Sequence, residues 1–443
     1  MRWILVAAAL PLAGCVASPP DVDAARLTAD AVGLHDAVLM RGSRDPLDVT
    51  GPLPTPLAVA EAGELAVRNS PDVQAALAEV RASLADAKQA RLLSNPVLDL
   101  NVRFGGETEV IEAGLAQPLV DLLSRPVRSR IADARLRAAA QRTIVAALEA
   151  LRDAEQSHAQ AVAADARLAV LQERNNLLDR LLDIAESRRR AGEASALDVG
   201  GFRARRAALD AEAIGVRLER RTARLTLLRL VGRPSGNVEL SLDADDETAP
   251  VTAEHDYIRT ALSVRPEVQA ETFELAALGD EVTLAGFAPF DALAAGVETE
   301  TEDETSVGPA VSVPIPIFDF GTQGKRRARA QVLAARHRLT GIARQVVEEV
   351  RQAHAAAVAA DKRVVAVEDS VLPLQRERVE RTFAAYRAGF ADLTDVLAAE
   401  QDLLAAEAEL IDARLQRRVA RADLRRASGG VARSPLPTTQ PTP

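Results

Sequence analysis

Two short turns place acidic side chains near the start of a helical segment. Residues 190–192 read Arg-Ala-Gly and are followed by Asp198, whereas residues 387–389 read Arg-Ala-Gly and are followed by Asp395. Both features recur at an offset of 197 residues (387 − 190 and 395 − 198). Asp392 lies about one helical turn before Asp395. Such carboxylates could stabilise a helix through its dipole or attract cations, and the residues alone leave both interpretations open.

No other group of side chains forms a pattern typical of catalysis or of a resident metal. The histidines share no metal-ligand spacing: His35, His158, His255, His337 and His354. The sequence also lacks a nucleophile with a matching His and acid, a phosphate-binding loop and a dinucleotide fingerprint. We therefore predict a protein that is not an enzyme, has no cofactor and has no metal site.

The composition favours long, closely packed helices. Apolar residues make up 48% of the 443 residues, but aromatic residues make up only 3%, and most apolar residues are Ala, Leu and Val. The net charge is −10, with both signs spread along the helical segments. Because no basic block stands out, we predict no nucleic-acid partner.

The N-terminus resembles the signal of a bacterial lipoprotein. Arg2 precedes an apolar run over residues 3–12, and residues 12–15 read Leu-Ala-Gly-Cys. In this resemblance Cys15 becomes the acylated first residue of the mature chain, and Val16 in place of Asp favours the outer membrane. An ordinary secretory signal cleaved nearby is the alternative. Cys15 is the only cysteine, so the chain forms no internal disulfide.

Long stretches with helical periodicity flank both turns. We predict helices over residues 126–190 and 197–231 around the first turn, and over 324–387 and 392–428 around the second. Pro373 should kink or loosen the third of these helices. The predicted coiled-coil seams are Leu171, Asn175, Leu178, Leu182 and Ala185 in the first copy, and Val350, Ala353, Ala357, Ala360, Val364, Val367, Val371 and Leu374 in the second.

Two stretches change to the two-residue period of β-strands. Residues 97–104 and 109–117 alternate apolar with polar or small side chains, and residues 293–315 repeat the pattern around an acidic turn. Each strand is near the roughly 9–11 residues that cross a bilayer when tilted. Four membrane strands cannot close a barrel, because open edges leave backbone groups unpaired in lipid. We therefore expect a symmetric homotrimer in which three copies supply twelve strands.

The duplicated pattern divides the chain into six segments. They are a signal peptide (1–14), an extended leader (15–55), a first repeat (56–232), an acidic linker (233–252), a second repeat (253–428) and a disordered tail (429–443). The predicted fold class is mostly α with membrane β. Each repeat supplies a long coiled-coil helical hairpin and one β-hairpin.

The repeat and its motifs resemble the TolC-like outer-membrane efflux proteins. Residues 313–319 read Val-Pro-Ile-Pro-Ile-Phe-Asp, and residues 95–98 and 117–119 read Asn-Pro-Val-Leu and Gln-Pro-Leu, which favours the branch that exports heavy-metal cations. The resemblance covers about residues 56–428. It implies a trimeric, twelve-stranded outer-membrane β-barrel continuous with a periplasmic α-helical barrel. It also implies a periplasmic adaptor protein, an inner-membrane RND-type pump and outer-membrane lipid as partners.

The resemblance also implies roles for residues at the two turns. Family members narrow their tunnel with rings of carboxylates at the periplasmic end. Asp395 matches this position, and Asp392 is a candidate for a second carboxylate, because Ala398 stands where the family has Asp. Asp198 is the corresponding acid of the first repeat. The hairpin tips that would contact the adaptor are Arg190, Gly192, Arg387 and Gly389. The simplest explanation of the two glycines is the left-handed conformation of a turn that follows a helix end.

These observations predict the exit duct of a tripartite efflux pump. It would conduct its cargo passively, with metal cations as one candidate cargo. Two alternatives share some features: a periplasmic adaptor lipoprotein and a structural coiled-coil lipoprotein. The period-two stretches argue against the second alternative, and the two hairpins argue against the first.

Overall fold

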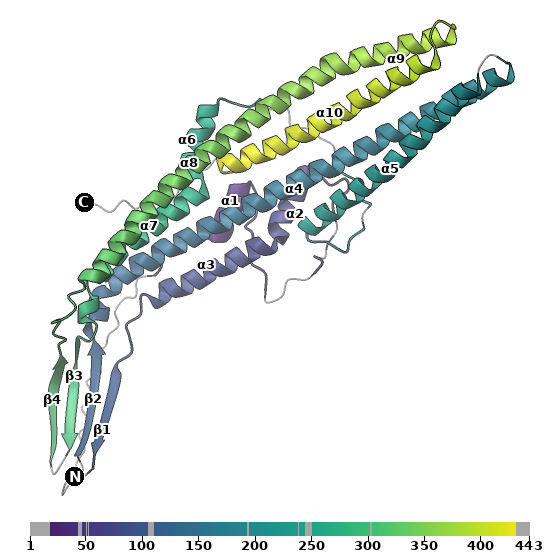
Figure 1. Cartoon of the computed structure of the whole chain (residues 1–443). Helices are drawn as coiled ribbons and strands as arrows, with labels where there is room; N and C mark the ends of the chain where they lie inside the picture. Colours follow the sequence, from purple (N-terminus) through teal and green to yellow (C-terminus); the bar gives the residue numbers. More distant parts are fainter. Residues whose placement is uncertain are drawn as a thin grey trace. The chain divides into compact units, whose positions relative to one another are not determined.

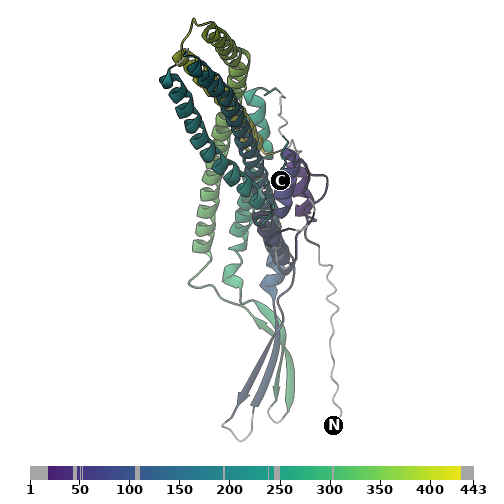
Figure 2. The same ribbon diagram turned by 90° about the vertical axis from the view of Figure 1, so that its right-hand side faces the viewer.

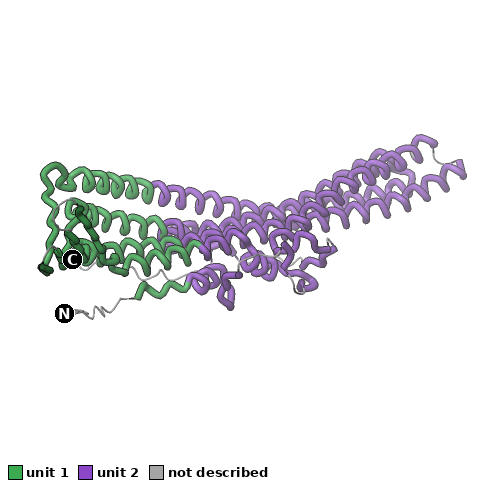
Figure 3. Tube along the Cα trace, turned by 90° about the horizontal axis from the view of Figure 1, so that it is seen from below, with its two compact units in different colours: residues 1–23, 79–140, 270–340 green, residues 24–78, 141–269, 341–443 purple. Residues whose placement is uncertain are grey.

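The structure, a computed structural model, divides into two compact units, coloured in Figure 3. Unit 1 contains residues 1–23, 79–140 and 270–340, and unit 2 contains residues 24–78, 141–269 and 341–443. The structure describes residues 18–42, 47–49, 51, 53–104, 110–192, 195–237, 239–243, 250–301 and 304–430. Cys15, the expected signal peptide and residues 431–443 of the expected tail lie outside the described residues.

Helices account for most of the described chain, and two pairs of strands interrupt them (Figure 1). The first half contains α1 (Ala24–Val32), α2 (Val59–Asn69), α3 (Pro71–Gln89), β1 (Val97–Arg103), β2 (Val110–Pro118), α4 (Leu119–Arg190) and α5 (Ala196–Leu230). The second half contains α6 (Glu254–Val264), α7 (Pro266–Leu284), η1 (Ala288–Phe290), β3 (Ala294–Thr301), β4 (Thr305–Ser312), α8 (Thr322–Ala366), η2 (Val367–Val371), α9 (Leu372–Arg387) and α10 (Leu393–Ser428). None of the helices in the described residues is long and apolar enough to cross a membrane.

The strands of unit 1 form one antiparallel sheet in the order β1-β2-β3-β4 (Figure 2). Strands β2 and β3 join the two predicted hairpins. Leu98, Leu115, Val297 and Pro309 stand opposite one another in a single cross-strand row. Side chains of one row share a face, and successive rows alternate between faces. One face therefore carries mainly aliphatic and Thr side chains, and the other carries mainly polar, charged and small residues.

Two residues of the sheet are explained by backbone geometry. A Cβ on Gly296 would lie 2.0 Å from the carbonyl oxygen of Leu115, so only glycine fits where β3 approaches β2. Pro309 lies on β4, an edge strand of this sheet, which is where a residue without an N–H is tolerated. The predicted return strand extended to Val313 and Ile315, but β4 ends earlier. The prolines between and after these two residues cannot donate to a ladder.

In unit 1 the first part of α4 packs against α7. Val127 and Ile131 are buried in a cluster with Ala277. The predicted start of this helix at residue 126 is wrong, because α4 begins at Leu119 and Pro126 lies inside it. Burial of the two branched side chains that follow offsets the backbone hydrogen bond that proline cannot make.

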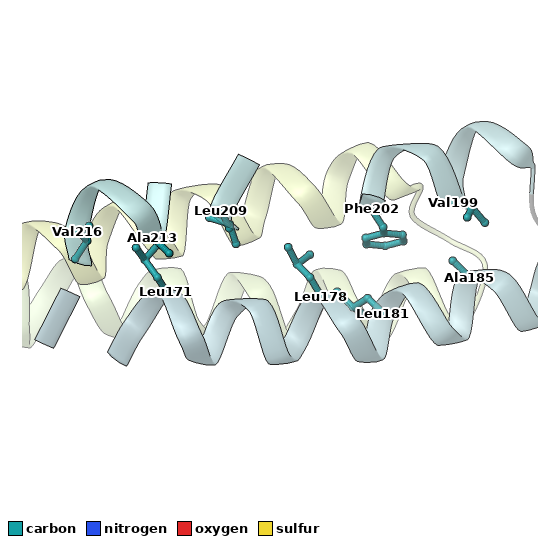
Figure 4. Close-up of a cluster of buried hydrophobic side chains, with 9 residues drawn as sticks. All are labelled: Leu171, Leu178, Leu181, Ala185, Val199, Phe202, Leu209, Ala213 and Val216. Atoms are coloured by element: carbon teal, nitrogen blue, oxygen red, sulfur yellow. The ribbon is translucent and has the colours of Figure 1, made fainter. Parts of the chain in front are cut away.

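In unit 2, α4 and α5 form the first helical hairpin around one apolar cluster (Figure 4). Three predicted seam residues are buried there: Leu171, Leu178 and Ala185. Phe202 from α5 is the largest of the fully buried side chains in the described residues, with 1% exposure. Full burial of a Leu or Phe side chain contributes about 1.5–3 kcal/mol. Asn175, a polar member of the predicted seam, donates from Nδ2 to Oδ1 of Asp210 at 2.9 Å.

The second hairpin pairs α10 with a helix that is interrupted by the π-helical segment η2. The predicted loosening near Pro373 is confirmed, because η2 ends just before it. The predicted seam is wrong beyond Val367. Val371 and Leu374 are exposed, whereas Leu372 is buried. A π-helical turn holds an extra residue, so the buried positions after it shift along the chain.

The expected extended leader contains a packed helix. In α1, Ala29 and Ala31 are fully buried, and Val38 after the helix is also buried. The backbone N–H of Arg41 donates to Oε1 of Gln74 at 2.7 Å. The prediction of an extended leader over residues 15–55 is therefore wrong for this stretch. A helix this short is stabilised mainly by tertiary contacts, which leave a weak signal in the sequence.

Candidate functional site at the hairpin tips

The first candidate turn joins α4 to α5 in unit 2. Arg190 ends α4 and donates to Oγ of Ser187 at 3.0 Å. Gly192 has φ of 82°, and its N–H donates to the carbonyl oxygen of Arg189 at 3.1 Å. Glycine adopts this left-handed conformation without the steric cost that a Cβ would add. Asp198 lies in the first turn of α5, and its side chain lies outside the described residues.

The second candidate turn joins α9 to α10. Arg387 ends α9, and Gly389 follows with φ of 80°. The N–H of Gly389 donates to the carbonyl oxygen of Tyr386 at 3.1 Å, and the N–H of Phe390 donates to that of Ala385 at 2.9 Å. These bonds satisfy carbonyl groups that the helix end leaves without an intrahelical donor. Both turns therefore use glycine in the same conformation.

Asp392 and Asp395 form a capping box at the start of α10. Oδ1 of Asp392 accepts a hydrogen bond from the N–H of Asp395 at 2.9 Å, and Oδ2 of Asp395 accepts one from the N–H of Asp392 at 3.2 Å. Both residues are exposed. A cap of this kind typically stabilises a helix by about 1 kcal/mol. The structure thus brings two of the predicted site residues together. Capping of the first turn of α10 is sufficient to explain their contact.

The ends of the two hairpins contact each other within unit 2, where Figure 1 shows both turns at the same end of the helices. The guanidinium carbon of Arg188, on α4, lies 5.2 Å from the ring centre of Tyr386, on α9. Phe383 and Leu393 of the second hairpin pack against the apolar cluster of the first. These contacts hold each turn in a defined position relative to the other.

An ion-pair seam that was not predicted from the sequence joins α4 to α10. Arg174 lies 3.0 Å from a carboxylate oxygen of Glu400 and 2.6 Å from one of Glu407, and all three side chains are largely buried. Arg167 binds Asp412 farther from the turns. Burial raises the pKa of Glu400, and the nearby charge of Arg174 opposes that rise.

A signal for this seam was present in the sequence. Arg167 and Arg174 have heptad spacing, and so do Glu400 and Glu407. The sequence could not show which helix faces which, because the two helices lie more than two hundred residues apart along the chain. No group of His, Cys, Asp and Glu side chains could hold a metal ion in the part of the chain that the structure describes.

Comparison with known proteins assigns the chain to a class. The model of the outer membrane efflux protein family matches residues 62–233 and 257–430. The two matches together span most of the 443 residues, so the chain belongs to this family. The search of curated protein sequences finds no match.

Solved structures of outer-membrane proteins share the fold. The outer-membrane channel OprN is 19% identical with a TM-score of 0.70, covering 89% of this chain and 99% of its own. The outer membrane protein VceC from Vibrio cholerae is 17% identical with a TM-score of 0.67, covering 84% and 96%. The MtrE channel from Neisseria gonorrhoeae, solved in its open state, is 16% identical with a TM-score of 0.67, covering 92% and 99%. At these identities the likeness establishes the fold.

Proposed function

We propose that this protein is the outer-membrane exit duct of a tripartite efflux pump. In this proposal three copies close a twelve-stranded barrel, and their helical hairpins close a periplasmic tunnel. The duct conducts its cargo passively, because the energy for export comes from an inner-membrane RND-type pump. A periplasmic adaptor protein connects the pump to the hairpin tips.

One observation carries the proposal: the sheet of unit 1 exposes an aliphatic face. Leu98, Leu100 and Leu115 on this face are all more than half exposed, as are Val307 and Val311. A face of this kind is stable against lipid or against another protein, but it is costly in water. The unpaired outer edges of β1 and β4 add a second requirement, because such edges need partners inside a membrane. Pairing between copies would supply partners for the edges, and a closed barrel in a bilayer would turn the aliphatic face toward lipid.

The turn carboxylates are proposed as the periplasmic aperture. Symmetry would bring three copies of Asp392 and of Asp395 around the tunnel axis, and Asp198 of the first repeat would add to them. Rings of carboxylates attract cations and repel one another when the opening narrows. The capping box supports this role, since it holds both carboxylates at the turn.

The remaining segments complete the proposal. Residues 1–14 act as a signal peptide, and Cys15 carries the lipid that anchors the mature chain to the outer membrane. Arg190, Gly192, Arg387 and Gly389 form the surface that meets the adaptor.

The repeats occupy residues 56–232 and 253–428, with the linker over 233–252 between them and the tail over 429–443 after them. Heavy-metal cations are the proposed cargo, because the sequence motifs around the strands resemble those of the branch that exports such cations.

The decisive experiment measures assembly and conduction together. The protein purified in detergent should have the mass of a trimer by native mass spectrometry, and it should form water-filled pores in planar bilayers. A stable monomer that forms no pores would refute the duct.

The aperture needs its own measurement. D395N should lower the preference of the pore for cations over anions, whereas E377Q, an exposed acid of α9 away from the turn, should leave it unchanged. Equal ion selectivity in the wild-type protein and in D395N would refute the aperture while leaving the duct intact.

A further inference from the structure

The segment between β4 and α8 in unit 1 exposes an unusual run of large apolar side chains. Phe318 is 97% exposed and Phe320 is 67% exposed, and both follow three exposed aliphatic residues: Val313, Ile315 and Ile317. The only charged residue between Val313 and Phe320 is Asp319. A loop of this composition would be unfavourable in water, so something must cover it.

The loop is held in place by its own hydrogen bonds and by one tight contact. The N–H of Gly321 donates to Oδ1 of Asp319 at 2.8 Å, and the N–H of Ile317 donates to the carbonyl oxygen of Ile315 at 2.9 Å. Gly321 has φ of 73°, and a Cβ there would lie 2.8 Å from Cγ of Pro289 in η1. Because it accepts the hydrogen bond from the N–H of Gly321, the carboxylate of Asp319 has a backbone partner inside the loop. Phe318 and Phe320 are exposed next to this close approach of the backbone to η1.

A cluster of cations follows the loop directly, in the first turns of α8. It consists of Lys325, Arg326, Arg327 and Arg329. In the described part of the chain none of these four forms an ion pair, and α8 has no acidic residue in its first turn. Cations at this end of a helix are opposed by the helix dipole. Such an arrangement is locally unfavourable, which indicates a role outside the helix.

The corresponding region of the first repeat is arranged differently. At an offset of 197 residues, Lys325 corresponds to Arg128, which lies 3.4 Å from a carboxylate oxygen of Asp121 in the first turn of α4. Arg130 likewise pairs with Asp280 at 2.7 Å. Arg128 and Arg130 therefore have carboxylate partners inside unit 1, whereas none of the four cations at the start of α8 has a described carboxylate within ion-pair distance.

We propose that residues 313–329, the junction segment, bind the surface of a phospholipid bilayer. The loop side chains insert at the boundary between headgroups and acyl chains, and the cations of α8 contact the lipid phosphates. Aromatic and aliphatic side chains next to Arg and Lys are typical of segments that lie in a membrane interface. The loop also continues the aliphatic face of β4, which carries Val307 and Val311. This inference rests on the proposed membrane role of the sheet.

Fluorescence of an introduced tryptophan can test the apolar half of this proposal. The only tryptophan of the sequence is Trp3, so in a W3F background each variant carries a single reporter. Full-length F318W, reconstituted in phosphatidylcholine vesicles with brominated acyl chains, should show blue-shifted emission that is strongly quenched. F390W is the matched control, because Phe390 is 88% exposed but belongs to the second hairpin turn. Its emission should stay unquenched.

A third reporter, V307W, separates this inference from the proposed function. If V307W is quenched but F318W is not, the membrane sheet stands and the junction segment is refuted as a lipid anchor. If F318W has blue-shifted emission without quenching, a second protein copy covers the loop, and the proposal also fails. If neither variant is quenched, the proposed membrane sheet fails along with the anchor.

A charge variant tests the cationic half. We expect R326Q/R327Q/R329Q to weaken binding of short-chain phosphatidylglycerol by at least about tenfold in native mass spectrometry of the detergent-purified protein, since each basic residue adds to attraction by anionic lipid. The control R203Q/R206Q/R381Q removes the same charge from exposed, ion-paired arginines of unit 2 and should change this affinity little. Equal losses in both variants, or no loss in the first, would overturn the phosphate contacts.

Discussion

The two helical hairpins of unit 2 share the order helix, turn, helix, but they differ in the size of their buried side chains. The first is filled by large side chains such as Leu178 and Phe202. At the offset of 197 residues, Ala399 replaces Phe202 in the second, and further buried alanines such as Ala357 and Ala413 line that hairpin. Large side chains bury more apolar area for each residue, whereas small ones allow the backbones closer together. The first hairpin therefore gains more stability from its own core.

The outgoing helices of the two hairpins differ as well. In the first hairpin α4 is continuous from Leu119 to Arg190, whereas in the second the helix changes to η2 before α9 begins. Segments of π-helix are sites where a helix bends and where an extra residue is tolerated. We infer that the first hairpin is the stiffer one and that the second deforms more easily. Four experiments test whether the two hairpins differ in this way, and each is measured by urea unfolding of the detergent-purified protein with circular dichroism.

The largest expected difference comes from deleting one exposed residue in each outgoing helix. Deletion of Gln172 should rotate Leu178 and Leu181 away from the core by about 100°. The loss of their burial, together with the packing of Phe202, should cost at least about 6 kcal/mol. Deletion of Asp369, its counterpart inside η2, should convert the segment to α-helix and cost no more than about 1 kcal/mol. Equal costs for the two deletions would show that η2 does not accommodate an extra residue.

A core truncation should have the next largest effect. F202A removes a fully buried ring from the first hairpin and should lower the free energy of unfolding by about 3–5 kcal/mol. F390A removes an exposed ring and should change that energy by less than about 0.5 kcal/mol. A change below about 1 kcal/mol for F202A would mean that the core of the first hairpin is not its main source of stability.

The ion-pair seam between the hairpins should contribute less than the core. R174A leaves the carboxylates of Glu400 and Glu407 without their common partner in a largely buried position, at a cost of roughly 3 kcal/mol. As a control, R378A removes an exposed pair with Asp402 within the second hairpin and should cost less than about 1 kcal/mol. If the two variants behave alike, the seam adds nothing beyond an ordinary surface pair.

The smallest effect concerns pH. Burial, opposed by the charge of Arg174, raises the pKa of Glu400 above its ordinary value of 4.5, so folding favours the protonated carboxyl. The contribution of protonated Glu400 to the free energy of unfolding is present at pH below 4.5. It is lost as the pH rises through the higher pKa that Glu400 has in the folded state.

E400Q should remove the loss of stability at higher pH, because glutamine has no carboxyl group that ionises. Relative to the wild-type protein, the variant should gain stability as the pH rises from about 4 to about 7. E377Q, at an exposed acid of α9, should keep the wild-type profile. Parallel pH profiles for E400Q and the wild-type protein would contradict the direction of the pKa shift.

Some elements were predictable because their signals are local. The turns at Gly192 and Gly389, the capping pair Asp392 and Asp395, and the change to a two-residue period near residue 97 depend on neighbours along the chain. The helix α1 was missed because it is short and depends on distant contacts. The seam after Val367 was predicted in the wrong phase, because one π-helical segment shifts every later position.

The duplicated plan, the positions of the turns and the residue types on each face of the strands could all be predicted from the amino-acid sequence. These properties follow from periodicity and from backbone preferences of single residues, which act over a few positions. The folded structure was needed to show that Arg174 meets Glu400, that β2 pairs with β3, and that Lys325 and Arg327 lack the carboxylate partners of their first-repeat counterparts. Each of these depends on which segments meet in space, and chain neighbours do not encode that choice.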